Sequence, residues 1–519
     1  MQPGIHTAID VAAFVRRAAE AWPDRVALAW EDGSRTYAAL MGRVDALAAA
    51  FAARGVGAGD RVAFALVNGP AFVETYLATQ SLGAIAVPMN PRQTAREFAW
   101  VLGNAEPKLT VGDALSAPVL RTLADVPGPV IDGVEALWPG AGSLVALVAA
   151  GGARRLPEIA IAATAPAVIL YTSGTTGQPK GVVRSQQALC MIIALRQAAM
   201  NIGPDTVLLA TTPMFHAAGH EFMLLQTLAA GGRVVTRRSF DADSLVDLGT
   251  REGVTHAFFV PTMAVHLTEA LKRRGGGWPS LKLWVSAASP LLDPIRDAIL
   301  AAVPHAELWN CYGLTEGGTL AYTRHADIRR KPGVCVGKAA PAMALRVIDG
   351  AGRDADTDTV GEIVCRSPES MLGYWRDPGK TAVTLKDGWV HSGDLGFFDD
   401  EGYLHLVGRL KDMIITGGEN VYAAEVESYL LSSGHLDDVA IIGVPHPVWG
   451  EAVVAVGVAK GAVDSLEREI ESFARAGLAP HKRPKRLVLR AELPKNGMGK
   501  VQKDRLRQEL ADLFTAGAA

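Results

Sequence analysis

The twelve residues YTSGTTGQPKGV, from Tyr171 to Val182, are the most informative stretch of this 519-residue chain. Seven of the twelve are Gly, Ser or Thr, one is Lys, and the apolar run AVIL precedes them. Small residues after a buried strand let backbone N–H groups face an anion, and hydroxyl groups and an ammonium add further donors. The stretch therefore predicts a phosphate-binding loop, and the alternative is an ordinary glycine-rich turn.

This loop differs from the P-loop of kinases and other NTPases. The P-loop has the pattern G-x-x-x-x-G-K-[ST], in which a Ser or Thr directly after the lysine binds the metal. Here Gly177 stands three residues before Lys180, and Gly181 follows the lysine. The pattern therefore argues against an ordinary kinase or NTPase.

Composition predicts a globular protein with more than one domain. The chain is 49% hydrophobic and 20% charged, and its length exceeds one ordinary domain core. The net charge of −3 gives no electrostatic reason to expect nucleic acid or an anionic membrane as a partner. No apolar run reaches the length of a membrane span and the N-terminus does not resemble a signal peptide, so we expect a cytoplasmic protein. The four cysteines lie far apart, which favours reduced thiols over a metal site or a disulfide framework.

The order of the predicted elements indicates an α/β fold. Helical and strand patterns alternate from about residue 36 to 90 and again through the middle of the chain, as expected for doubly wound parallel sheets covered by helices. Residues 351–400 resemble short antiparallel strands and form a β-rich part. After Arg409 a strand, a helix, two strands and a C-terminal helix predict a small α+β domain. We therefore predict a large domain over residues 1–409 and a small domain over residues 410–519.

Three polar segments stand where predicted strands end. They are the phosphate loop, VSAASP (Val285 to Pro290) and YGLTE (Tyr312 to Glu316). Ligands of open α/β sheets bind at the carboxyl ends of the strands. Any one of these segments alone fits a structural turn, but together they suggest one shared cleft.

The full string YTSGTTGQPKGV closely resembles the phosphate loop of adenylate-forming enzymes, the superfamily of acyl-CoA synthetases and firefly-luciferase-like proteins. The resemblance covers nearly the whole chain, through PMFHAAGH, YGLTE, SGDLG, GRLKDMIITGGENVY and LPKNGMGKVQK. It implies an AMP-dependent acyl- or aryl-CoA synthetase, an acid–thiol ligase that uses ATP, Mg²⁺ and coenzyme A.

The resemblance implies an ATP site that these motifs share. Tyr312 would stack on adenine, Thr315 would bond the phosphate, and Glu316 would hold Mg²⁺, for which a carboxylate oxygen is a suitable ligand. Two further residues would bond the ribose hydroxyl groups, Asp394 in SGDLG and Arg409 in GRLKD. The implied ATP-binding residues are Thr172, Ser173, Gly174, Thr175, Thr176, Gly177, Lys180, Tyr312, Asp394 and Arg409.

The same resemblance implies which residues are catalytic. His216 would lie beside the acyl carboxylate, and Lys500 would be the catalytic lysine of the C-terminal loop, although Lys495 and Lys503 flank it. Lys411, two residues after the arginine of GRLKD, would be the hinge of the small domain, at a position where many relatives carry Asp. Without the resemblance, a lone histidine or lysine would be interpreted as a structural or surface residue. The implied catalytic residues are Lys500, Thr315, Glu316 and His216.

The CoA and acyl contacts complete the implied site. The pantetheine tunnel corresponds to Gly417 and Gly418, and the CoA nucleotide to Trp449 and to Arg483 in the basic run HKRPKR, which also fits a solvated face. Small apolar walls favour an aromatic or short-to-medium-chain monocarboxylate, and the lack of Arg or Lys among them argues against a dicarboxylate. The predicted acyl-pocket residues are Ala217, Ala218, Phe258, Ala288, Trp309, Gly313 and Gly317.

The expected reaction is acyl-adenylate formation followed by thioester formation with CoA, with rotation of the small domain between the two steps. Free CoA is the expected acceptor because few residues follow Lys500, and a carrier protein loaded in trans is the alternative. A light-emitting oxidase has no supporting residue, and a non-catalytic nucleotide sensor is disfavoured because Lys500 and Glu316 are both present. We expect only small-molecule partners, namely the acid, ATP and CoA. The sequence leaves the oligomeric state open, a homodimer included.

Overall fold

The computed structural model describes residues 10–133, 140–152, 159–172, 178–331, 334–461, 465–495 and 501–514. By its contacts the chain divides into two compact units. The first comprises Met1–Leu345 with Cys365–His391, and the second comprises Arg346–Val364 with Ser392–Ala519. This division by contacts does not test the predicted boundary between residues 409 and 410, which is the expected hinge between two moving domains. That boundary stays a prediction.

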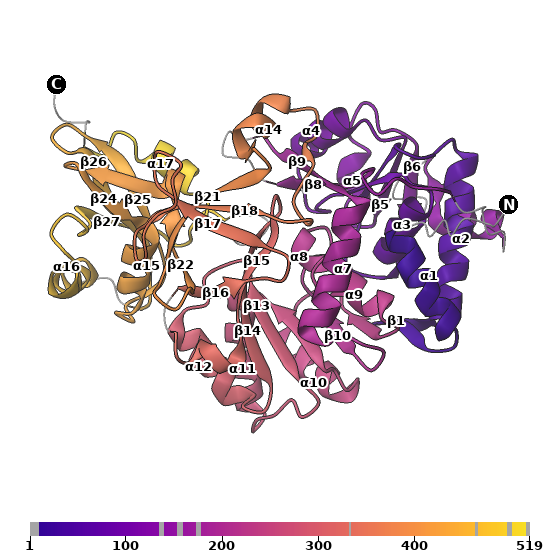
Figure 1. Cartoon of the computed structure of the whole chain (residues 1–519), viewed down its shortest axis with the longest axis horizontal. Coiled ribbons are helices and arrows are strands. Elements are labelled where there is room, and N and C mark those ends of the chain that lie inside the picture. The colour runs from indigo at the N-terminus through magenta and orange to yellow at the C-terminus, as the bar shows by residue number, and fades with distance from the viewer. Residues whose placement is uncertain are drawn as a thin grey trace. The chain divides into compact units, whose positions relative to one another are not determined.

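One sheet of the first unit is built mainly from parallel strands (Figure 1). Its parallel pairs run from β1 through β11, β10, β12 and β13 to β14, and antiparallel strands flank them on both sides. In spatial order the strands are β16 (Cys335–Ala339), β15 (Gly318–Thr323), β14 (Glu307–Leu314), β13 (Leu283–Ala287), β12 (His256–Phe259), β10 (Val207–Ala210), β11 (Arg233–Thr236), β1 (Val26–Trp30) and β2 (Gly33–Thr36).

A second sheet of the same unit carries the phosphate-loop motif. Its strands β8, β4, β3, β5, β6 and β7 are parallel, whereas β9 returns antiparallel to β8 and β19 pairs antiparallel with β9. In spatial order the strands are β19 (Gly373–Tyr374), β9 (Lys180–Ser185), β8 (Pro166–Thr172), β4 (Ile85–Pro88), β3 (Arg61–Ala65), β5 (Leu109–Asp113), β6 (Pro129–Asp132) and β7 (Gly142–Ser143).

Several helices of the first unit begin at polar N-cap side chains that satisfy free backbone N–H groups, whereas others, such as α3 and α11, begin with a proline and have no side-chain cap. Thr94 and Glu97 form a reciprocal capping box at the start of α4, and Ser185 caps α7 by accepting from the backbone N–H of Ala188. The helices are α1 (Val11–Ala21), α2 (Tyr37–Ala53), α3 (Pro70–Ser81), α4 (Ala95–Ala105), α5 (Ala117–Leu120), α6 (Leu144–Gly151), α7 (Gln186–Met200), α8 (Ala217–His220), α9 (Leu224–Ala229), α10 (Ala242–Arg251), α11 (Pro261–Arg273), α12 (Asp293–Ala302), α13 (His325–Ile328) and α14 (Pro378–Thr384).

Apolar faces of these helices and sheets form the cores of the first unit. One core contains the fully buried side chains of Trp278, Trp284 and Phe259, which pack with residues of α10, α11 and α12. A second core packs Phe98 and Val101 of α4 against strands of the second sheet. Burial of such apolar area is the main stabilising contribution in both.

The second unit is an α+β arrangement around the hairpin of β25 (Leu436–His446) and β26 (Gly450–Ala459). Its sheet has the order β24 (Glu419–Tyr422), β23 (Met413–Thr416), β26 and β25, with β27 (Arg486–Leu489) on β26. The core joins α15 (Ala423–Leu431) and α16 (Leu466–Gly477) to this sheet, and α17 (Lys503–Glu509) packs on β25. The second unit also contains β22 (Leu404–Arg409) and the short 3₁₀ helix η2 (Leu410–Asp412). Strand β20 (Leu385–Lys386) belongs to the first unit, and β17 (Ala344–Ile348), β18 (Gly361–Arg366) and β21 (Trp389–Phe398) have residues in both.

The elements expected from the sequence are present. The alternating pattern of residues 36–90 forms α2, β3, α3 and β4, and the C-terminal pattern forms β23, α15, β25, β26 and α17. All four cysteines are buried free thiols. Within the part of the chain that the structure describes, no helix is long and apolar enough to cross a membrane.

Candidate active site

The phosphate-loop motif is a hairpin between β8 and β9. Thr172, at the end of β8, lies opposite Lys180, the first residue of β9. Gly181 is required here because a Cβ atom would lie 2.7 Å from Cγ2 of Ile169. Five predicted ATP-binding residues lie outside the described residues, namely Ser173, Gly174, Thr175, Thr176 and Gly177.

The lysine of this hairpin is linked to the glutamate of YGLTE through one tyrosine. The Nζ atom of Lys180 lies 5.1 Å from the centre of the Tyr374 ring. The Tyr374 hydroxyl donates a 2.8 Å hydrogen bond to Oε1 of Glu316. Burial, and secondarily the Glu316 carboxylate, raise the pKa of Tyr374, so its hydroxyl stays a hydrogen-bond donor at neutral pH. Two motifs that are far apart in the sequence therefore meet in the first unit.

The YGLTE segment begins within β14 and continues towards β15. Tyr312 lies near the end of β14 and is buried. The backbone oxygen of Glu316 accepts a 2.8 Å hydrogen bond from the backbone N–H of Met371. Close packing leaves no room for a side chain at Gly313, within the segment, or at Gly317, directly after it. A Cβ atom on Gly317 would lie 2.6 Å from Sγ of Cys365, and one on Gly313 would lie 2.5 Å from the backbone oxygen of Gly318.

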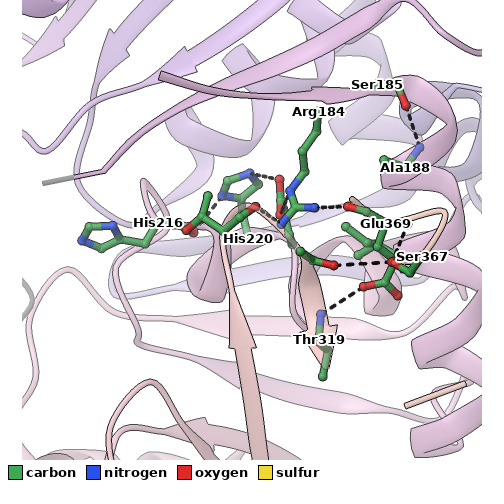
Figure 2. Close-up of polar contacts among 12 residues, drawn as sticks. Arg184, Ser185, Ala188, His216, His220, Thr319, Ser367 and Glu369 are labelled. Carbon is green, nitrogen blue, oxygen red and sulfur yellow. Dashed lines mark hydrogen bonds and ion pairs between the residues drawn. The ribbon is translucent and has the colours of Figure 1, made fainter. Parts of the chain in front are cut away.

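A buried arginine lies behind this segment (Figure 2). Arg184 of β9 is 2% exposed, and its Nη2 donates a 2.6 Å hydrogen bond to the backbone oxygen of Thr315. Its Nη1 donates to the backbone oxygen of Glu369. Its Nε lies 3.0 Å from Oε2 of the buried Glu221 carboxylate, which balances the charge. Arg184 therefore ties the phosphate-loop hairpin to YGLTE.

A second buried ion pair adjoins the first. Arg196 of α7 contacts both carboxylate oxygens of Glu369, at 3.1 and 3.0 Å. The same carboxylate accepts from the backbone N–H of Thr319 at 3.1 Å, and the backbone N–H of Glu369 donates to Oγ of Ser367 at 3.0 Å. Figure 2 shows Thr319, Ser367 and Glu369 grouped on the same side of Arg184. This bidentate geometry fixes the chain directly after YGLTEG.

The PMFHAAGH motif forms the short helix α8, which His216 precedes. The backbone oxygen of His216 accepts from Nδ1 of His220 at 3.0 Å, and that of Met214 accepts from the same atom at 2.7 Å. Nδ1 of His220 therefore carries the proton. Burial lowers the pKa of His220 below its ordinary value, and Glu221 opposes that shift. The two imidazole rings point in different directions (Figure 2), and the ring of His216 lies 4.1 Å from that of Phe215.

The residues predicted for the acyl pocket come from several strands and one helix of the first unit. Ala217 and Ala218 lie in α8. Phe258 in β12 is buried and its ring centre lies 5.1 Å from that of Phe222. Ala288 follows β13 with a φ of 72°, a strained conformation for an alanine. Trp309 in β14 is buried, with the guanidinium of Arg324 4.9 Å from its ring.

The predicted ribose-binding pair is assembled within the second unit. Asp394 in β21 lies opposite Arg409 in β22, and Oδ1 of Asp394 is 3.1 Å from Nε of Arg409. The predicted hinge residue Lys411 lies in η2, where its Nζ is 3.3 Å from Oδ2 of Asp504. Its neighbour Asp412 pairs with Arg507 at 2.7 Å. Both ion pairs join η2 to α17.

The predicted CoA face also lies in the second unit. Gly417 and Gly418 form the turn between β23 and β24, with φ values of 61° and 86°, and the backbone N–H of Gly417 donates to the backbone oxygen of Trp449 at 2.9 Å. The Trp449 ring is 39% exposed, stacks on His446 with centres 4.2 Å apart, and has Nζ of Lys485 4.8 Å from its centre.

Of two further predicted site residues of this unit, the structure describes Arg483 but not Lys500. Arg483 donates from Nε to the backbone oxygen of Leu478 at 2.8 Å, so its guanidinium also supports the domain itself. The predicted catalytic Lys500 lies outside the described residues. Its neighbours are both engaged in ion pairs: Lys495 with Asp438 at 2.6 Å and Lys503 with Glu427 at 2.7 Å.

The geometry adds residues that the sequence interpretation did not include. Arg184 and Tyr374 contact YGLTE, and Glu369 contacts Thr319 shortly after it. His446 and Lys485 contact Trp449. Most of them gave little signal in the sequence because their partners are distant along the chain. His446 is the exception, since it stands three residues before Trp449. The segment GYW (Gly373 to Trp375), shortly before α14, has no sequence pattern that distinguishes a site residue such as Tyr374 from an ordinary strand residue.

The comparisons with known proteins decide the family. A model of AMP-binding enzymes matches residues 15–375, and a model of the AMP-binding enzyme C-terminal domain matches residues 425–500. The chain belongs to the AMP-binding enzyme family. The first match includes the phosphate loop, PMFHAAGH and YGLTE, and the second includes LPKNGMGKVQK as far as Lys500. The motifs SGDLG and GRLKDMIITGGENVY lie between the two matched ranges.

Named relatives agree with this assignment over the whole length. This AMP-binding enzyme is 34% identical over 509 residues to the indoleacetate–CoA ligase of Aromatoleum aromaticum, which covers 97% of this chain and 98% of the relative. It is 32% identical to the fatty acid–[acyl-carrier-protein] ligase ScoC of Streptomyces coeruleorubidus, over 100% of this chain and 98% of the relative. ATP-bound MatB from Rhodopseudomonas palustris is 30% identical and superposes with a TM-score of 0.86, over 98% of this chain and 100% of that one.

These matches confirm three predictions. The AMP-binding enzyme is a member of the adenylate-forming superfamily, it has the predicted α/β fold with a separate C-terminal domain, and it is an AMP-forming acyl-CoA synthetase. It is an ATP-using enzyme, and its named relatives include CoA ligases.

Proposed function

We propose that this enzyme activates an aromatic or short-to-medium-chain monocarboxylic acid and transfers the acyl group to the thiol of CoA. One observation carries the choice of a monocarboxylate. The two buried guanidinium groups around the predicted acyl pocket are already neutralised, Arg184 by Glu221 and Arg196 by Glu369. A second substrate carboxylate would need an ion-pair partner of its own, and these two arginines do not offer one.

The position of Arg196 relates this argument to the pocket. Its guanidinium lies 5.5 Å from the centre of the Phe222 ring, and that ring contacts Phe258, one of the predicted pocket walls. An aromatic or aliphatic acyl group would therefore meet aromatic rings and the small side chains of α8. Apolar contacts of this kind suit a hydrophobic tail.

The first half-reaction joins two anions. A carboxylate oxygen of the acid attacks the α-phosphorus of ATP, the bond to the β-phosphate oxygen breaks, and acyl-AMP and pyrophosphate form. Neutralisation and alignment should dominate the rate. Lys180 and Lys500 would supply positive charge, and the Thr315 hydroxyl would donate to the phosphate. In the second half-reaction the CoA thiol attacks the acyl carbon, AMP leaves, and the thiol proton is lost.

Glu316 would hold the Mg²⁺ ion that ATP carries. No group of three or more His, Cys, Asp or Glu side chains suited to a metal occurs among the described residues, so the protein would contribute few ligands. That fits Mg²⁺, which is often bound through one or two carboxylates together with substrate phosphates and water. When bound, the ion would reduce the negative charge of the triphosphate.

Rotation of the small domain about Lys411 would serve the second half-reaction. It would withdraw Lys500 and present the turn of Gly417 and Gly418. The ion pairs of Lys411 with Asp504 and of Asp412 with Arg507 favour a hinge that moves together with α17.

A carrier-protein thiol is the second candidate acceptor. The similarity to an acyl-carrier-protein ligase across the full chain favours it. The exposed Trp449 and Lys485 favour CoA instead, because an aromatic ring and an ammonium suit a nucleotide with phosphate groups.

A substrate panel tests the proposal. The purified enzyme is given ATP and Mg²⁺ with benzoates, cinnamates, linear fatty acids of increasing length and dicarboxylates, each with CoA or with a phosphopantetheinylated carrier protein. AMP and the thioester are measured by mass spectrometry. We expect a CoA thioester of one aromatic or short-to-medium-chain acid. Preference for a dicarboxylate would overturn the proposed substrate class, and thioester on the carrier alone would overturn CoA as the acceptor.

A further inference from the structure

The segment from Met371 to Trp375 is held between the phosphate-loop hairpin and YGLTE. On one side, the backbone N–H of Trp375 donates a 2.7 Å hydrogen bond to the backbone oxygen of Gly181. The backbone N–H of Leu372 donates a 2.8 Å hydrogen bond to the backbone oxygen of Val183. On the other side, the backbone N–H of Met371 donates a 2.8 Å hydrogen bond to the backbone oxygen of Glu316. These backbone bonds fix the segment relative to both motifs.

The Tyr374 side chain projects from this fixed segment towards the two charged groups. Its own backbone N–H donates to Oγ1 of Thr381 at 2.9 Å, which anchors β19 to α14. The tyrosine is only 7% exposed, so its ring has little freedom. Its hydroxyl donates to Oε1 of Glu316 at 2.8 Å, and Nζ of Lys180 lies 5.1 Å from its ring centre. One side chain thus contacts a cation through its ring and a carboxylate through its hydroxyl.

We propose that Tyr374 is a positioning residue that orients the Glu316 carboxylate for the metal ion of ATP and holds Lys180 beside it. The inference rests on the proposed Mg²⁺ role of Glu316. A hydrogen bond to one carboxylate oxygen fixes the plane of the carboxylate and directs its other oxygen to the ligand position. Groups that hold a metal ligand from behind commonly matter for metal affinity as much as for geometry.

The ring acts on the second partner. An ammonium over the face of a tyrosine ring is attracted by the negative face of that ring, and more strongly so where the pair is desolvated. Lys180 has a flexible stem with several rotamers, and contact with the Tyr374 ring reduces that freedom. A preorganised ammonium beside a preorganised carboxylate would let nucleotide and metal bind without rearranging either group.

Two substitutions separate the two effects. Tyr374→Phe removes the hydroxyl and keeps the ring, so Glu316 loses its donor and Lys180 keeps its contact. Tyr374→Leu removes both. Tyr37→Phe is the matched control, because the Tyr37 hydroxyl also donates to buried backbone oxygens, those of Leu228 and Gly232, in another part of the first unit.

The readout is binding, measured by titration calorimetry with α,β-methylene-ATP, which is not cleaved at the α-phosphate. Each protein is titrated with the nucleotide in excess Mg²⁺ and again with EDTA. We expect Tyr374→Phe to weaken binding with Mg²⁺ roughly tenfold, the loss of a hydrogen bond to a charged group, and to change metal-free binding less than twofold. Tyr374→Leu should also weaken metal-free binding, and Tyr37→Phe should match the wild type in both conditions.

The outcomes distinguish this inference from the proposed function. If Mg²⁺ does not strengthen binding to the wild type, the proposed metal site itself fails. If Mg²⁺ strengthens it equally in the wild type and in Tyr374→Phe, the positioning role of Tyr374 is wrong. Equal weakening of both titrations by Tyr374→Phe would mean a structural role only, and would also overturn the inference.

Discussion

Arg184 donates a 2.6 Å hydrogen bond to the backbone oxygen of Thr315 and is neutralised by Glu221, whose carboxylate lies 3.0 Å from its Nε. A residue of the phosphate-loop hairpin is thereby joined to the segment predicted to bind phosphate and metal. All of this lies in the interior, where an unpaired charge is costly. The geometry of YGLTE therefore depends on a buried ion pair that lies behind it.

We predict that Arg184→Met destabilises the protein by about 3–5 kcal/mol, because it leaves Glu221 buried without a partner. The double substitution with Glu221→Gln should destabilise it by less than the sum of the two single changes, since both charges are then removed. Urea unfolding monitored by tryptophan fluorescence measures the four proteins of this cycle. Additive effects would contradict an energetic coupling between Arg184 and Glu221.

Stability should depend on pH through His220. Burial lowers the pKa of His220 from its ordinary value of 6.5, so the folded state keeps the ring neutral while the unfolded state takes up a proton as the pH falls below about 6.5. The stability present above that pH is then lost on acidification, by at most about 1.4 kcal/mol per pH unit. We predict that His220→Asn, whose amide can replace the Nδ1–H donor, loses less stability than the wild type between pH 7 and 5. Parallel stability curves for the two proteins would contradict this.

The two half-reactions should respond differently to the loss of Lys500. We predict that Lys500→Ala abolishes adenylate formation while largely sparing thioester formation from supplied acyl adenylate. Adenylate formation is measured by the exchange of labelled pyrophosphate into ATP. Lys495→Ala is the matched control, because Lys495 is paired with Asp438 at 2.6 Å. Equal loss of both half-reactions in Lys500→Ala would contradict the proposed domain rotation.

The exposed Trp449 ring should matter for CoA alone. We predict that Trp449→Ala raises the KM for CoA roughly thirtyfold, since stacking and cation–π contacts are each worth about 1 kcal/mol and about 1.4 kcal/mol is a factor of ten. Adenylate formation should be unchanged. Val448→Ala is the control because this neighbouring side chain is 77% exposed and carries no ring. A matching rise for Val448→Ala, or none for Trp449→Ala, would place the nucleotide elsewhere.

Local sequence was enough to predict the architecture. Alternating patterns gave the correct strands and helices from α2 to β4, because burial periodicity is a local property. Asp394 and Arg409 were named through the family resemblance of SGDLG and GRLKD, and their ion pair across adjacent strands became visible only in the structure.

The supporting residues could not be predicted in the same way. Arg196 and Glu369 are 173 positions apart, and Tyr374 and Glu316 are 58 positions apart, so only the tertiary fold brings them together. A buried arginine such as Arg184 also has the same sequence appearance as an exposed one. Its role became visible only through burial and through its contacts with Thr315 and Glu221.

The most direct test of the account uses the accepted acid labelled with ¹⁸O in its carboxylate. The enzyme is allowed to turn over with ATP, Mg²⁺ and CoA, and the products are analysed by mass spectrometry. Because the carboxylate attacks the α-phosphorus, we predict that one ¹⁸O atom appears in AMP and none in pyrophosphate. Formation of ADP, or unlabelled AMP accompanied by labelled phosphate, would contradict activation through an acyl adenylate.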